Sequence, residues 1–151
     1  MNDEFYMMLA LKEAQKAERI DEVPVGAVVV DDHQQIIGQG FNRPISTNDP
    51  TSHAEINALR MASKRINNYR LTQATLYVTI EPCIMCMGAI IHARIKRIVF
   101  GASDPKWGAV LSLYNMASDH RLNHHPEIES GVCEEETRQI IKSFFMNKRS
   151  K

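Results

Sequence analysis

The chain lacks several features that define whole classes of protein. Its 151 residues contain no apolar run long enough to cross a lipid bilayer. The first four residues, Met-Asn-Asp-Glu, are acidic and differ from the basic and then apolar start of a secretory signal. Only three cysteines are present, an odd count that argues against a disulfide framework and for a reducing compartment. We therefore expect a cytoplasmic protein that does not associate with a membrane.

An excess of charge of one sign is also missing, because 18 basic residues balance 18 acidic ones. A protein that coats nucleic acid non-specifically is normally basic, so any contact with RNA must come from a local patch. The clearest candidate is the end of the chain, where Arg138, Lys142, Lys148, Arg149 and Lys151 follow the last acidic residue. A solvated helix end, whose cations suit the helix dipole, explains the same pattern.

The chain shows no repeat, low-complexity segment or linker, and its length suits a single domain over residues 1–151. Hydrophobic patterns predict helices at 3–19, 52–64, 82–93 and 133–148, a short helix that ends near 116, and strands at 25–30, 36–41, 76–80, 97–101 and 127–132. Asp3 is the expected cap of the first helix, and Pro82 suits a first helical position. This order of elements predicts an α/β fold, a three-layer α/β/α sandwich with a central mixed five-stranded sheet.

The most informative residues are a His-Ala-Glu sequence that ends at Glu55 and a Pro-Cys-Ile-Met-Cys sequence that contains Cys83 and Cys86. Two cysteines with this spacing can hold one metal ion from the first turn of a helix, and His53 supplies a third ligand from another segment. A catalytic zinc keeps three protein ligands and leaves its fourth position to water, which then ionises near neutral pH. Glu55 is placed to handle the protons of that water.

Each of these residues has another explanation when it is taken alone. The cysteine pair is compatible with a redox pair or with half of a structural zinc site. Ser52 and Glu55 fit a Ser-x-x-Glu capping box, in which the glutamate only bonds the helix backbone. Cys133 offers a fourth ligand that would close a structural site, although it lies far along the chain and is more simply explained as a small buried hydrophobe. A structural site has no need of Glu55, so the residues taken together favour a catalytic zinc.

The sequence His-x-Glu followed by Pro-Cys-x-x-Cys is the signature of zinc-dependent nucleobase deaminases, and the chain resembles the cytidine/deoxycytidylate deaminase superfamily. Within it, the chain is similar to the bacterial tRNA-specific adenosine deaminases over segments 22–28, 40–44, 49–56, 74–83, 100–106 and 144–149. The resemblance implies a cytidine deaminase-like fold. It also implies hydrolytic deamination of adenosine to inosine at the wobble position of a tRNA anticodon, in an arginine tRNA.

The resemblance further implies how the metal site works. His53, Cys83 and Cys86 would hold one Zn²⁺ per subunit, and Glu55 would act as the proton shuttle. The protein would be a homodimer in which both subunits contribute to the surface that binds the tRNA anticodon stem-loop.

Substrate-binding residues are also implied by position. Asn42 corresponds to the asparagine that reads the base, although an asparagine before Arg-Pro also suits a turn. Asp104, with Lys106 nearby, falls in the loop that contacts the nucleotides beside the target. Trp107 and Met146 depart from the commonest pattern of the family. Trp107 either adds a stacking surface for RNA or packs at the dimer interface, and Met146 weakens the case for a phosphate contact in the tail.

Two other functions fit parts of the pattern. A deaminase of a free base or nucleoside, such as guanine or cytosine, would share the zinc residues and need no RNA surface. A non-catalytic, zinc-stabilised RNA-binding module would need a closed set of four ligands, with Cys133 among them.

Overall fold

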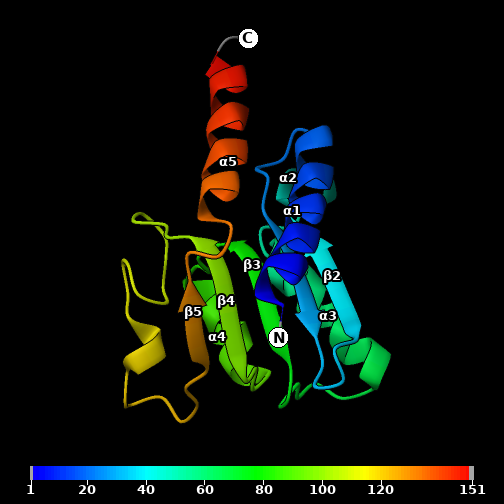
Figure 1. Cartoon of the computed structure of the whole chain (residues 1–151), viewed down its shortest axis with the longest axis vertical. Coiled ribbons are helices and arrows are strands. Elements are labelled where there is room, and N and C mark those ends of the chain that lie inside the picture. Colours follow the sequence, from blue (N-terminus) through cyan, green and yellow to red (C-terminus); the bar gives the residue numbers. More distant parts are fainter. Residues whose placement is uncertain (1, 150–151) are drawn as a thin grey trace.

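The computed structural model describes residues 2–149, which form a five-stranded mixed sheet between two layers of helices (Figure 1). The strands lie in the order β2 (Ile36–Phe41), β1 (Gly26–Val30), β3 (Thr75–Ile80), β4 (Arg97–Ala102) and β5 (Glu127–Ser130). β1 is antiparallel to β2 and β3, whereas β4 is parallel to β3 and β5. The expected α/β/α sandwich with a mixed five-stranded sheet is therefore confirmed.

The helices divide between the two faces of the sheet. They are α1 (Asp3–Arg19) and α5 (Glu134–Arg149) on one face, α3 (Ala54–Ile66) and α4 (Ile84–His92) on the other, and the short α2 (Pro44–Thr47) at the end of β2. In Figure 1, α1 lies in front of the sheet, α3 and α4 lie behind it, and α5 extends beyond the strand ends. Within residues 2–149, no helix combines the length and the apolar character that crossing a membrane requires.

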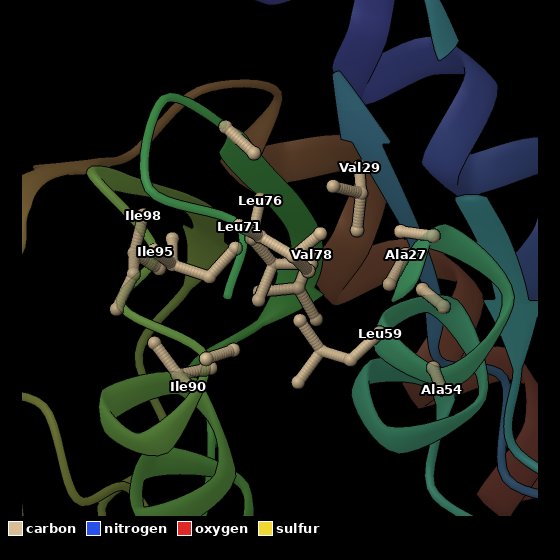
Figure 2. Close-up of a cluster of buried hydrophobic side chains, with 14 of the residues drawn as sticks. Ala27, Val29, Ala54, Leu59, Leu71, Leu76, Val78, Ile90, Ile95 and Ile98 are labelled. Atoms are coloured by element: carbon tan, nitrogen blue, oxygen red, sulfur yellow. The ribbon is translucent and has the colours of Figure 1, made fainter. Parts of the chain in front are cut away.

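Alternating side chains of the strands build a separate core on each face. The core toward α3 and α4 is the larger one, and Figure 2 shows part of it, in which Leu76 and Val78 of β3 face Leu59 of α3 and Ile90 of α4. The intervening residue Tyr77 points to the other face. All five residues of β1 are buried, which explains why that strand reads as a continuous apolar run.

A glycine of β2 brings helix α3 unusually close to the sheet. A Cβ atom at Gly40 would lie 2.7 Å from the backbone oxygen of Ala54 and 2.7 Å from the backbone nitrogen of Ala58. Such contacts are shorter than real side chains allow, so only glycine permits this spacing. Because Ala54 is the first residue of α3, this contact fixes the start of the helix against the end of β2.

The short helix expected to end near residue 116 is not found in the described residues. Residues 109–112 form turns, and only a 3₁₀ helix, η1 (Met116–Ser118), follows. The reason is a competing acceptor, because the backbone N–H groups of Val110, Leu111 and Ser112 all donate to the carboxylate of Glu81. The α2 helix was also missed, since the sequence predicts only a loop between β2 and α3.

Two residues expected at helix starts have other roles, and α3, α4 and α5 begin one or two residues later than expected. The cap of α1 is Asn2, whose Oδ1 accepts the backbone N–H of Phe5 at 3.1 Å. Asp3 instead forms a bidentate ion pair with Arg97, at 2.8 and 2.7 Å. The fourth helix begins at Ile84, so Pro82 precedes it rather than occupying the first helical position.

Candidate metal centre and active site

His53 and Cys83 each cap the N-terminus of a helix. His53 precedes α3 and Cys83 precedes α4, both with extended backbone dihedral angles; the His53 side chain makes no capping hydrogen bond, and the thiol of Cys83 bonds to Cys86 in the first turn of α4. The expectation that they lie within the first turn is therefore corrected by one residue. Cys86 lies within the first turn of α4 and is fully buried. Because the His53 imidazole does not cap its helix, it remains available as a ligand, and the sulfur of Cys83 lies beside the thiol of Cys86.

The three side chains converge. The Nδ1 atom of His53 lies 3.6 Å from Sγ of Cys83 and 3.5 Å from Sγ of Cys86. Around a tetrahedral zinc ion, Zn–S bonds of about 2.3 Å and a Zn–N bond of about 2.0 Å place sulfur and nitrogen about 3.6 Å apart. The ligand atoms of all three residues lie within 4.8 Å of one another. Both the chemistry and the spacing of these donors therefore fit zinc.

Cys133 does not belong to this group. Within residues 2–149, the group of ligand atoms contains only His53, Cys83 and Cys86. Cys133 directly precedes α5 and packs against the core on the α1 face, whereas α3 and α4 lie on the opposite face. The fourth ligand that a closed structural site would require is therefore not supplied by Cys133.

The pKa values of the two cysteines shift in opposite directions. A hydrogen bond with Cys86 lowers the pKa of Cys83 to about 4, while the same hydrogen bond and burial raise the pKa of Cys86. A hydrogen bond with Cys83 also raises the pKa of His53, against the effect of burial. The lowered pKa of Cys83 favours its thiolate form, which is the form that binds a cation.

Glu55 is buried beside this cluster and is not part of the ligand group. Its side chain is 3% exposed, and burial raises its pKa to about 7. The proposed capping box is wrong, because the cap is His53 rather than Ser52. The Ser52 hydroxyl instead accepts a hydrogen bond from Nδ2 of Asn57 at 3.1 Å. A carboxyl group that gains and loses a proton near neutral pH is suited to proton transfer.

Asn42 lies next to the start of α3 and is 9% exposed. Its neighbours on both sides are bonded to that region. The carbonyl of Phe41 accepts from Nδ2 of Asn57 at 3.0 Å, and the backbone N–H of Arg43 donates to the carbonyl of Ser52 at 3.0 Å. The structure therefore brings the segment of Asn42 beside the segment that carries His53.

Asp104 and Lys106 lie in a loop that runs beside Cys83. Gly108 of this loop forms a β-bridge with Cys83. The Asp104 carboxylate accepts the backbone N–H groups of Lys106 at 3.1 Å and Trp107 at 3.3 Å, so it shapes the tip of the loop. Lys106 and Trp107 are exposed on this tip. The expected zinc ligands, Glu55 and the expected substrate-binding residues thus all lie on the segments that surround the cysteine and histidine cluster.

Sequence reasoning gave no role to two buried acidic residues that hold the surrounding loops. Glu22, which is 1% exposed, accepts the backbone N–H groups of Ile45 and Ser46 at the start of α2. Glu81 binds the loop of Asp104. Burial acts to raise the pKa of Glu81, but backbone and side-chain hydrogen bonds, led by that from Leu111, outweigh it and hold the pKa below its ordinary value. The sequence feature that could have pointed to Glu81 is its position directly before the Pro-Cys sequence.

The family model described as the cytidine and deoxycytidylate deaminase zinc-binding region matches residues 1–102, which include the cysteine and histidine cluster and Glu55. The chain belongs to this deaminase family. The family resemblance expected from the sequence motifs is confirmed, and with it the zinc-binding character of the site.

Individual relatives define the branch of the family. A tRNA-specific adenosine deaminase of Haemophilus influenzae is 55% identical over 147 residues, which cover 97% of this chain and 85% of that protein. A solved structure from work on A-to-I editing by tRNA:A34 deaminases superimposes with a TM-score of 0.87 at 47% identity, covering 90% of this chain and 98% of that one. A guanine deaminase of Bacillus subtilis superimposes with a TM-score of 0.64 at 40% identity, covering 68% and 66%. The chain thus falls with the tRNA-specific adenosine deaminases of this family.

Proposed function

We propose that residues 1–151 form one zinc-dependent deaminase domain that converts adenosine to inosine at the wobble position of a tRNA anticodon, with an arginine tRNA as the substrate. The observation that carries this proposal is the site itself: three soft ligands with zinc spacing lie beside a buried carboxyl group that is not a ligand. The branch of the family to which the chain belongs supports the choice of substrate.

His53, Cys83 and Cys86 are the residues that would hold the metal ion. A zinc ion with three such ligands acts as a Lewis acid that brings the ionisation of a water molecule near neutral pH. Helices α3 and α4 both begin at the expected metal ligands, so the positive ends of their dipoles favour the negative charge that develops on the attacking oxygen.

Glu55 moves the protons of the reaction. Its carboxylate takes a proton from the attacking water and transfers it to the ring nitrogen next to the amino-bearing carbon of adenine. The carboxylate then takes the second proton, from the hydroxyl group now bonded to that carbon, and gives it to the departing amino group, so that the C=O bond forms and ammonia leaves. One water is consumed, one ammonia is released, and the purine becomes hypoxanthine. Burial suits Glu55 to this work because a pKa of about 7 lets it both accept and donate a proton near neutral pH.

The remaining candidate residues would bind the RNA around the target base. Deamination requires the base to leave its stack, which costs little in an anticodon loop where bases are unpaired. Asn42, beside the start of α3, would hydrogen-bond the edge of the base. Asp104 and Lys106, on the loop beside Cys83, would contact the neighbouring nucleotides.

We further infer a cytoplasmic homodimer. The three cysteines are free thiols, which is the usual state in a reducing compartment. Several large apolar side chains are exposed next to Cys83 and in the segment 107–114, namely Ile84 (52% exposed), Trp107 (66%), Leu111 (49%), Leu113 (51%) and Tyr114 (51%). Exposed apolar side chains in such number are typical of a surface that a partner covers. Sedimentation or light scattering of the zinc-loaded protein would report the mass, and a monomer at micromolar concentration would refute the dimer.

The experiment that tests the proposed function measures deamination of a panel of substrates by the zinc-loaded protein. The panel contains an arginine-tRNA anticodon stem-loop, the same stem-loop with guanosine at the wobble position, free adenosine, cytidine and guanine. We expect inosine only at the wobble adenosine. Deamination of guanine or cytidine with no inosine in the stem-loop would retain the zinc chemistry and refute the RNA substrate.

Guanine is included because the matched guanine deaminase shares the fold at 40% identity.

A further inference from the structure

The carboxylate of Glu81 joins the metal-binding segment to the loop of residues 103–112. Glu81 directly follows β3 and directly precedes Pro82 and Cys83, and it is 2% exposed. A buried acidic side chain normally needs several hydrogen-bond donors to offset the loss of water. Here the donors come almost entirely from the backbone of one distant loop.

Each oxygen of this carboxylate is used. The Oε2 atom accepts three backbone N–H groups, and the Oε1 atom accepts a fourth together with one hydroxyl group. The donors to Oε2 are the N–H groups of Val110 (3.1 Å), Leu111 (2.8 Å) and Ser112 (3.0 Å), and the donors to Oε1 are the N–H of Asp104 (3.0 Å) and the hydroxyl of Ser112. An ionised carboxylate is acceptor-only, so it matches five donors that converge on it.

The loop packs closely against the Glu81 carboxylate at Gly108. A Cβ atom at Gly108 would overlap the carboxylate carbon and Oε1 of Glu81, so only glycine fits there. A second attachment lies beside the first, because the backbone N–H of Ala109 donates to the carbonyl of Pro82 at 2.8 Å. The loop is therefore fixed to the segment that carries Cys83 by both the side chain of Glu81 and the neighbouring backbone.

We propose that Glu81 is a positioning residue that fixes Asp104 and Lys106 relative to Cys83, and so determines which nucleotides beside the target base are accepted. This inference rests on the proposed function. Its physical basis is direct: the N–H of Asp104 is bound to Glu81, while the side chain of Asp104 binds the N–H groups of Lys106 and Trp107. The position of the loop tip is thus transmitted through Asp104 from the carboxylate that precedes the metal-binding cysteines.

Two substitutions remove this attachment by different routes. Glu81→Gln keeps the shape of the side chain but replaces one acceptor by an NH₂ group, which then faces backbone donors. Gly108→Ala keeps the Glu81 side chain but places a Cβ atom against its carboxylate and against the backbone oxygen of Asp104, so it displaces both groups. Glu13→Gln is the matched control, because Glu13 is 6% exposed, pairs with Lys16 within α1, and makes no hydrogen bond to the 103–112 loop.

Three readouts on the zinc-loaded proteins separate positioning from general damage. Zinc content reports the metal site, and hydrogen exchange of peptides that cover residues 103–112 reports the loop. Steady-state kinetics on the arginine-tRNA stem-loop, and on stem-loops with a replaced nucleotide beside the wobble adenosine, report KM, kcat and discrimination. A residue with only a structural role would lower the active fraction, and therefore kcat, without changing KM or the preference between stem-loops.

We expect both variants to retain one zinc per chain and to exchange the loop amides at least tenfold faster. KM for the stem-loop should rise about tenfold, with kcat changed less, and the preference for the natural neighbouring nucleotide should fall by a similar factor. Glu13→Gln should match the wild type in all three readouts.

Unchanged exchange of the loop amides in both variants would overturn the inference whatever the substrate is. A loss of zinc, or an unchanged KM and preference in folded variants, would also overturn it. If the wild-type protein deaminates no stem-loop, the proposed function fails, and the exchange measurement still decides whether Glu81 holds the loop.

Discussion

The Nδ1 atom of His53 lies 3.5 Å from the Sγ atom of Cys86, although 33 residues separate them in the chain. Helices α3 and α4 pack on the same face of the sheet, and they produce this contact because both begin at the same end of the strands. Brought together in this way, an imidazole nitrogen and two sulfurs form the ligand set of a zinc site with an open fourth position.

Replacing Cys86 should remove the metal. Cys86→Ala deletes a fully buried ligand, so we expect zinc content to fall from about one per chain to below about 0.2, since two remaining ligands bind zinc weakly. Elemental analysis after dialysis measures this directly. Cys133→Ala is the control and should keep full occupancy, because Cys133 lies outside the ligand group. Full occupancy in Cys86→Ala would show that other residues bind the metal.

The close contact between β2 and α3 should be sensitive to a single methyl group. Gly40→Ala places a Cβ atom 2.7 Å from backbone atoms of α3, so the helix must move away from the strand. We expect the free energy of unfolding to fall by about 1–3 kcal/mol, the usual cost of overpacking. Because His53 is the residue that caps the start of α3, zinc affinity should fall as well. The neighbouring substitution Gln39→Ala, at an exposed position, should change stability by less than about 0.5 kcal/mol.

Equal effects of the two substitutions in urea unfolding would contradict this explanation of Gly40.

The ion pair between Asp3 and Arg97 should stabilise the fold in a pH-dependent way. Hydrogen bonding to Arg97 holds the pKa of Asp3 below its ordinary value. The stabilisation is therefore complete above the unfolded-state pKa of about 3.9 and is lost as the pH falls through the lower folded-state pKa. We expect Asp3→Asn to lower the free energy of unfolding by about 2 kcal/mol at pH 7, with the difference from wild type shrinking below about pH 4.

Urea unfolding at pH 7 and pH 3 tests this prediction, and the exposed Asp32→Asn serves as the control. A difference between Asp3→Asn and wild type that is the same at both pH values would show that the charge of Asp3 is not involved.

Most of the fold follows from local hydrophobic patterns. The strand over Ile36–Phe41 has the bounds that its pattern predicts, and the other strands differ from prediction by one or two residues. The features that were missed depend on partners far away in the chain. The local sequence predicts that Asp3 caps a helix, but in the fold Asp3 binds Arg97, which lies 94 residues away in the chain. No local pattern reveals such a partner, because it is the sheet that brings the two residues together.

The same limit applies to the site. The spacing of Cys83 and Cys86, together with His53, predicts a metal cluster because ligand spacing on a helix start is a local property. Glu81 could not be assigned in this way, since a glutamate at the end of a strand is usually exposed and its donors lie 23 to 31 residues further along. Those donors also explain why residues that read as a short helix form turns instead.

Zinc-dependent deamination with Glu55 as the proton shuttle is tested most directly by the turnover of Glu55→Gln on the arginine-tRNA anticodon stem-loop, measured together with its zinc content. We expect one zinc per chain, an unchanged fold and a single-turnover rate of inosine formation reduced at least about a hundredfold, because the amide cannot shuttle protons. Glu13→Gln, which removes another buried carboxylate, should react at the wild-type rate. A Glu55→Gln protein that keeps its zinc and forms inosine at nearly the wild-type rate would show that Glu55 is not the proton shuttle.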